Sequence, residues 1–159
     1  MVLPTYSASA FFTDVNPSDS NVADFTSFGM TDGQCLVAIF CKDNSFVTQP
    51  APSGWVSIDS VTGSQPQFIA MKWGSTGRWS TGDATTVTFT PSLYASVLWI
   101  GAFNNIDCSS NCVDNHGTQA GAGTTVTAPS KSILTAPTAA LAIQAFCVQG
   151  KTTNTSPTG

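Results

Sequence analysis

The sequence predicts an all-β protein, built as one antiparallel, jelly-roll-like β-sandwich of about eight strands. Charged residues make up only 9% of the 159 residues, far below the roughly 25% usual in soluble domains. The acidic residues are nine Asp and no Glu, so the Glu–Lys pairs that stabilise surface helices cannot form. In their place stand 19 Ser and 22 Thr, which suit turns and pleated strands.

Short apolar segments separated by turn residues divide the chain into an N-terminal arm (1–19), a sandwich domain (20–149) and a polar C-terminal tail (150–159). The arm holds one small apolar patch, Phe11 and Phe12. The expected strands are 22–30, 34–42, 55–61, 68–73, 85–90, 93–103, 124–128 and 139–148.

Three of these strands are apolar on both sides, which is typical of strands covered on both faces. They are 34–42, 93–103 and 139–148, and the second is the longest, so we expect it near the centre of a sheet. Ala and Leu also make 139–148 a candidate helix. That alternative is weaker because the segment is short and has no capping residues.

Two other strands alternate between polar and apolar residues, the pattern of strands buried on one face. In 85–90 the inward residues are Val87 and Phe89. In 55–61, Trp55 begins one side and Val56 begins the other.

The charge pattern excludes several classes of partner. The net charge is −4, and the five basic residues are scattered, whereas phosphate binding needs clustered Lys and Arg; we expect no nucleic acid. No apolar run approaches the roughly 20 residues that span a bilayer. The first residues lack the basic and apolar regions of a secretory signal. We therefore expect either that the protein is not exported by the general pathway and leaves its host cell by lysis, or that the sequence is a mature form.

The cysteines number five, so at least one has no partner within the chain. Cys35, Cys41 and Cys147 fall in expected strands, where cysteine usually acts as a small buried apolar residue. Cys35 and Cys41 lie on one face about 20 Å apart, too far for a disulfide.

Cys108 and Cys112 lie instead in a long loop, and three interpretations stay open. Our prediction is a local disulfide, which would stabilise the loop by about 2 kcal/mol. A metal site would combine the two thiols with His116 and either Asp107 or Asp114, although this spacing is not a standard zinc pattern. The third interpretation is two unpaired thiols.

No catalytic constellation is visible. His116 is the only histidine, and no Gly-x-Ser-x-Gly turn presents a nucleophile to it. Every Asp except Asp59 lies beside a turn or at a strand end, and a lone carboxylate does not make a glycosidase pair. We therefore expect no enzyme activity, no catalytic residue, no cofactor and no metal.

The aromatic residues are four Trp, two Tyr and ten Phe, and most fit a sandwich core better than a sugar-stacking platform. Trp79 is different because it follows Arg78 in the turn 77–82. An exposed Trp–Arg pair is a typical contact hot spot. We therefore expect Arg78 and Trp79, like Phe11 and Phe12, to contact a partner.

The order of several short motifs from Gln34 onward resembles a family of phage virion β-sandwich proteins, found as capsid decoration or tail-associated components. The motifs are Asp32-Gly-Gln-Cys-Leu-Val-Ala, Pro52-Ser-Gly-Trp55, Phe68-Ile-Ala-Met-Lys-Trp73, the Thr-Val-Thr-Phe of 86–89, the apolar strand and turn of 99–107, and the Thr-Thr-Val-Thr-Ala-Pro-Ser of 124–130. The loop from Cys108 to His116 and the two arms depart from that pattern.

The resemblance implies a jelly-roll-like sandwich without catalytic residues on the exterior of a phage particle. Because the chain starts at Met1 and holds one domain, we expect a capsid decoration (cement) protein that binds the major capsid protein and stabilises the head. Its arms would bridge neighbouring subunits, and it would form a homotrimer or homodimer.

Two alternatives remain. The first is a tail- or fibre-associated module that binds a receptor or host surface glycan, with exposed aromatics near Trp79 or in the loop 104–123. The second, weaker one is a secreted bacterial adhesin, against which the missing signal sequence counts.

Overall fold

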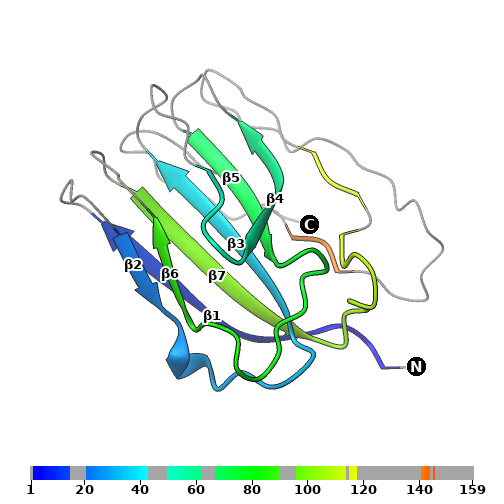
Figure 1. Cartoon of the computed structure of the whole chain (residues 1–159). Coiled ribbons are helices and arrows are strands. Elements are labelled where there is room, and N and C mark those ends of the chain that lie inside the picture. Colours follow the sequence, from blue (N-terminus) through cyan, green and yellow to red (C-terminus); the bar gives the residue numbers. More distant parts are fainter. Residues whose placement is uncertain are drawn as a thin grey trace.

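A computed structural model of the chain describes residues 2–14, 21–42, 50–61, 67–89, 96–113, 115–117, 141–143 and 145. All seven strands in these ranges pair antiparallel and form two sheets (Figure 1). The predicted antiparallel all-β fold is confirmed. Within these ranges one 3-10 turn, η1 (Thr26–Phe28), interrupts the strands, and none of the described helical structure is long and apolar enough to cross a membrane.

The larger sheet has five strands and the smaller sheet two. In spatial order the larger sheet contains β1 (Thr5–Asp14), β7 (Ser96–Asn104), β3 (Cys35–Lys42), β5 (Gln67–Trp73) and β4 (Trp55–Val61). The smaller sheet pairs β2 (Asn21–Asp24) with β6 (Thr86–Phe89) and lies in front of β1 and β7 in Figure 1. The predicted central position of the strand now seen as β7 is confirmed, since it pairs with both β1 and β3.

Most predicted strands are found where the sequence indicated. The strand expected at 55–61 is β4, and β3, β5, β6 and β7 differ from their predicted bounds by a few residues at most. The strand expected at 22–30 ends early, because Asp24 Oδ1 accepts hydrogen bonds from Thr26 N (2.9 Å) and Thr26 Oγ1 (2.6 Å) and turns the chain into η1.

The two C-terminal strand predictions fare differently. The strand at 124–128 lies outside the described residues. Of the strand expected at 139–148, the structure describes 141–143 and 145, and none of these residues is in a strand or a helix. Leu141 and Ile143 are 42% and 40% exposed, so the prediction of a buried strand is wrong for these residues.

The predicted N-terminal arm is also wrong over most of its length. Thr5–Asp14 is β1, which pairs with β7 from one end to the other. On its inner face Ala8, Ala10 and Phe12 lie opposite Ala102, Ile100 and Leu98. Alanine and serine hide this alternation, because small residues give little contrast in hydrophobicity between the two faces. The tail 150–159 lies outside the described residues.

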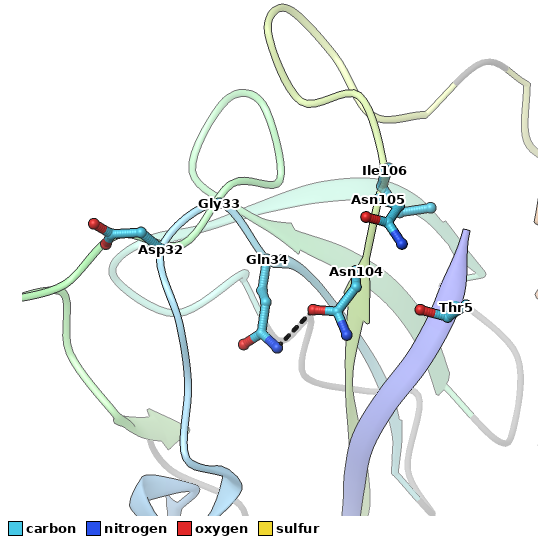
Figure 2. A pocket seen from close by; sticks show the side chains of 7 residues that line it. All are labelled: Thr5, Asp32, Gly33, Gln34, Asn104, Asn105 and Ile106. Atoms are coloured by element: carbon cyan, nitrogen blue, oxygen red, sulfur yellow. Dashed lines mark hydrogen bonds between the residues drawn. The ribbon is translucent and has the colours of Figure 1, made fainter. Parts of the chain in front are cut away.

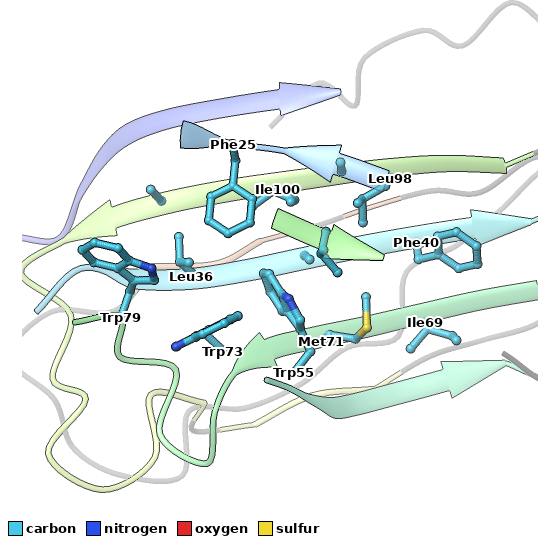
Figure 3. Packing of buried hydrophobic residues seen from close by; sticks show 14 residues of the cluster. Phe25, Leu36, Phe40, Trp55, Ile69, Met71, Trp73, Trp79, Leu98 and Ile100 are labelled. Carbon is cyan, nitrogen blue, oxygen red and sulfur yellow. The ribbon is translucent and has the colours of Figure 1, made fainter. Parts of the chain in front are cut away.

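The core fills the space between the two sheets (Figure 3). The inner face of the larger sheet contributes side chains from every second position of β3, β5 and β7, as the two-residue period of a strand requires. The smaller sheet and its neighbours contribute Ala23, Phe25 and Val87. The largest fully buried apolar side chains are Phe25, Leu36, Phe40, Met71 and Ile100.

A tight turn before β4 fixes two tryptophans at one end of this core. Trp55 N donates to Pro52 O (3.0 Å), and Gly54 has a φ of +84°. A Cβ on Gly54 would lie 2.7 Å from the ring of Trp73, so only glycine fits both the backbone and the contact. The rings of Trp55 and Trp73 meet edge to face, 5.5 Å apart.

The outer face of the larger sheet carries a second, smaller cluster. Its buried members are Cys35, Val37, Phe103 and Cys108. Around them pack the half-buried side chains of Ile58, Trp99, Ile106 and Cys112. The segment that follows β7 therefore lies against the outer face and brings two of its cysteines to the start of β3.

Candidate functional site

The loop after β7 is held in place by hydrogen bonds at three points. Asn105 has a left-handed backbone (φ +60°) and its Nδ2 donates to Leu3 O (3.1 Å). Asp107 Oδ1 accepts from Ser109 N (2.9 Å), forming a local turn. Cys112 N donates to Thr76 O (2.9 Å), which joins the loop to the turn after β5.

Three cysteines converge under this loop. The sulfur atoms of Cys35, Cys108 and Cys112 all lie within 4.8 Å of one another. Cys35 and Cys108 are buried, while Cys112 is half-buried. Cys108 and Cys112 carry unbridged thiols in this structure, and the disulfide between them stays a prediction. The described His116 is not a member of the group, so the site differs from the one whose spacing was considered in the sequence.

Gly77 closes one side of the three-cysteine cluster (Cys35, Cys108 and Cys112). Its φ is +93°, and a Cβ there would lie 2.2 Å from Cys112 Sγ and 3.3 Å from Cys35 Sγ. Its backbone is fixed, because Gly77 N donates to Trp73 O (2.8 Å) and Gly77 O accepts from Leu36 N (2.9 Å). The sulfurs of Cys112 and Cys35 therefore pack directly against Gly77. Any other residue at this position would displace these sulfurs.

The three thiols form a hydrogen-bonded network with one preferred anion. Hydrogen bonds from Cys108 and Cys35 stabilise the Cys112 thiolate, and with the nearby Lys72 they lower the pKa of Cys112 to about 3. Donation to Cys112 raises the pKa of Cys108 to about 11. The pKa of Cys35 is also raised, first by its hydrogen bond to Cys108 and then by that to Cys112. The three shifts therefore favour a negative charge on Cys112 over one on Cys35 or Cys108.

A buried lysine lies beside this anion. Lys72 is on the outer face of β5, and its Nζ donates a hydrogen bond to Asn111 Oδ1. The same oxygen accepts a hydrogen bond from Val113 N (3.1 Å). This bond joins the two residues that flank Cys112 in the sequence. A buried ammonium group needs a compensating negative charge, and the Cys112 thiolate supplies one.

A polar hollow of about 490 Å³ lies at the other end of the same loop (Figure 2). Its lining comprises Thr5, Asp32, Gly33, Gln34, Asn104, Asn105 and Ile106. Gln34 is buried and fully used: its Nε2 donates to Ser7 Oγ (3.0 Å) and Asn104 Oδ1 (2.9 Å), and its Oε1 accepts from Thr31 N (3.0 Å). These bonds tie the ends of β1, β7 and β3 together.

The exposed position predicted for Trp79 is wrong. Trp79 is only 5% exposed and belongs to the core between the sheets. Its N donates to Gln34 O (2.9 Å) and its O accepts from Gly33 N (3.0 Å), so the turn folds back along the chain entering β3. Arg78 pairs with Cys35 through its backbone, and Arg78 is exposed, as predicted for that residue.

The two phenylalanines of β1 point to opposite faces. Phe12 lies opposite Leu98 and packs against the core, which is a structural role. Phe11 lies opposite Trp99 and is 71% exposed. Of this predicted pair, Phe11 is therefore the residue available to a partner.

His116 lies at the opposite edge of the sheet. Its Nδ1 is 3.0 Å from Asp59 Oδ2 on β4, where a bulge between Ser57 and Asp59 shifts the register. An exposed contact of this kind contributes little to stability. No sequence pattern pairs these two residues, which are 57 positions apart.

No protein-family model matches the chain, and no curated protein or solved structure matches it either. Its function must accordingly be argued from its own residues and their contacts.

Proposed function

We propose that the chain is a non-enzymatic structural protein of a phage particle, a decoration protein that binds the outer shell of the head. The observation that carries the proposal is the edge formed by β1. Among the described strands, β1 pairs only with β7, so its other side presents backbone donors and acceptors that no described strand uses. Such an edge can accept a strand from a partner.

Exposed apolar side chains gather on this edge. Phe11 and Tyr6 of β1 are 71% and 59% exposed, and Val2 and Leu3 just before the strand are exposed as well. Exposed aromatic residues beside unused backbone groups are typical of interaction surfaces. Both edge strands have a bulge, between Tyr6 and Ala8 in β1 and between Ser57 and Asp59 in β4. β4 differs because an acidic residue, Asp59, lies at its bulge, and a charge on an edge strand is a common protection against pairing.

The partner in this proposal is the major shell protein. A decoration protein occupies many equivalent sites on a shell, so a modest contact at each chain is enough when several chains act together. The chain is rich in Ser and Thr and poor in charged residues. This composition agrees with an exterior that contacts other proteins of the particle. A homotrimer or homodimer would present several β1 edges at once.

The test is to mix the purified chain with particles that lack it, sediment the particles and image them. We expect stoichiometric, regularly spaced binding and a gain in resistance to heat. Phe11→Lys should abolish binding, because it places a charge on the pairing edge. Val56→Lys is the matched control: Val56 is also exposed (42%) but lies on β4. Absence of shell binding, or equal loss in both variants, would contradict the proposal.

A second candidate is a glycan-binding module of the tail or fibre, favoured by the polar hollow at Thr5, Asp32, Asn104 and Asn105. Hydroxyl, amide and carboxylate groups of this kind can bind sugar hydroxyls. The burial of Trp79 removes the aromatic platform expected for this function near that turn. Binding of the chain to a glycan array, lost in Thr5→Val, would support it, whereas an array without signal would remove it.

A further inference from the structure

We propose that Cys35, Cys108 and Cys112 form a binding site for a thiophilic divalent metal ion, with Zn²⁺ as the ion that fits best. The inference is independent of the proposed particle role, because it rests on the outer-face cluster rather than on β1. Zinc sites in proteins commonly use three cysteines with a fourth ligand. In the part of the chain that the structure describes, no fourth ligand atom joins the three sulfurs.

The geometry of the sulfurs fits one ion. Zinc–sulfur bonds are about 2.3 Å long, so tetrahedral thiolates lie about 3.8 Å apart. The three sulfurs are already within 4.8 Å of one another, and small side-chain movements would bring them to that spacing. They come from β3 and from two points of one loop, so a common ion would join segments that are more than 70 residues apart in the sequence.

A metal explains three converging sulfurs better than a disulfide does. A disulfide joins two of them and leaves the third as a buried thiol beside the bridge. Gly77 allows both Cys35 and Cys112 to approach the same point, since its missing Cβ would overlap Cys112 Sγ and crowd Cys35 Sγ. A metal ion uses all three sulfurs.

The charges around the cluster also fit. Three thiolates without a metal would place three negative charges in a largely buried site, which is strongly unfavourable. With Zn²⁺ the net charge is −1, and the ammonium of Lys72 lies close enough to favour the Cys112 thiolate. Asn111 fixes that ammonium, so Lys72 and Asn111 act as positioning residues outside the ligand shell.

The binding step follows from the protonation states. Each sulfur coordinates as a thiolate, so each cysteine that carries a thiol proton releases it to solvent as the ion binds. No electron is transferred. The bound ion would fasten the loop after β7 to β3 and to the turn that contains Gly77.

The experiment uses the full chain, reduced and freed of metal with a chelator, then titrated with Zn²⁺ and separately with Co²⁺. We expect uptake of one ion per chain, and for Co²⁺ the charge-transfer absorption that thiolate ligands produce. Cys112→Ser should weaken that absorption, because one of the three thiolate ligands is lost. Cys41→Ser is the matched control, because Cys41 is a half-buried cysteine of β3 outside the cluster and its loss should leave uptake unchanged.

Cys35→Ser changes a buried residue and could fail to fold. Two variants at less buried positions, Cys112→Ser and Asn111→Ala, keep the test decisive. Cys112 is half-buried, and Asn111→Ala leaves the three sulfurs in place but removes the hydrogen bonds from Lys72 Nζ and Val113 N. We expect Asn111→Ala to weaken metal binding by about 10–100-fold. Amide spectra of each variant check the fold. No uptake by the reduced chain would overturn the proposal, as would a thiolate absorption of unchanged strength in Cys112→Ser. Equal loss in Cys41→Ser would overturn it too.

Discussion

The two faces of the larger sheet use the same strands for different purposes. On the inner face β3 presents Leu36 and Phe40, which pack among apolar side chains of both sheets. On the outer face the same strand presents Cys35, beside two more cysteines and a buried lysine. The inner face therefore determines the free energy of unfolding, and the outer face holds the groups that can bind something. Substitutions that separate these two properties test this division.

The largest effect is expected from the inner face. Phe40→Ala removes a fully buried ring and should lower the free energy of unfolding by about 3–5 kcal/mol. Phe11→Ala removes a ring of the same size from the exposed side of β1 and should change it by less than about 0.5 kcal/mol. Chemical denaturation of both variants measures the difference. Similar losses in the two would contradict the division between the faces.

Gly77 and Gly82 provide the next comparison. Both have a positive φ, +93° and +98°, but only a Cβ at Gly77 would meet other atoms, the nearest being Cys112 Sγ. Gly77→Ala should therefore destabilise the chain by about 1–3 kcal/mol more than Gly82→Ala does. It should also impair metal uptake, whereas Gly82→Ala should not. Thermal unfolding and Co²⁺ titration are the measurements, and identical behaviour of the two variants would refute the close contact at Gly77.

Trp73 and Trp55 test the polar contacts of the inner face. Trp73 Nε1 donates to Asp83 Oδ2 (2.9 Å), but Trp55 Nε1 is buried without an acceptor among the described residues. Replacing either ring by Phe creates a similar gap, and only Trp73→Phe also removes a hydrogen bond to a charged group. We expect it to cost about 1–3 kcal/mol more than Trp55→Phe, as measured by urea denaturation. The reverse order would show that Trp55 has an acceptor elsewhere.

The smallest effect concerns protons. The pKa of Cys112 is lowered to about 3 and that of Cys108 raised to about 11, and that of Cys35 is raised as well. Zinc binding at neutral pH should therefore release two protons rather than three, which calorimetry in buffers of different ionisation enthalpy measures. Release of three would show that Cys112 is not the thiolate.

The same pKa values give a pH dependence of stability for the metal-free, reduced chain. Since the pKa of Cys112 is lower in the folded state than its ordinary value of 9.0, the unfolded chain binds more protons at this residue between those values. The stability that Cys112 contributes therefore rises with pH and is complete above about 9. The difference in unfolding free energy between the wild type and Cys112→Ser should grow from pH 5 to pH 8.

Sequence patterns predicted most of the sheet because its central strands are strongly apolar. The runs at 34–42 and 93–103 indicate buried strands without any knowledge of their neighbours, and they are β3 and β7. β1 was missed because its alternation uses alanine and serine, which differ little in hydrophobicity. Its partner β7 supplies the apolar surface that makes it a strand.

The cysteine site could not be predicted because it depends on how strands are paired. Cys35 lies opposite Phe103, and only this register brings the loop that follows β7 to the start of β3. The burial of Trp79 has a similar origin, since the pairing of Cys35 with Arg78 turns the next residue into the core. Sequence spacing identified Cys108 and Cys112 as a pair but gave no indication of the third sulfur.

The most direct test of the outer-face site is X-ray absorption at the zinc edge of the full chain after titration with one equivalent of Zn²⁺. We expect three sulfur neighbours at about 2.3 Å, reduced to two in Cys112→Ser and unchanged in Cys41→Ser. A shell of oxygen and nitrogen neighbours alone would contradict the account and leave the three cysteines as thiols that merely pack together.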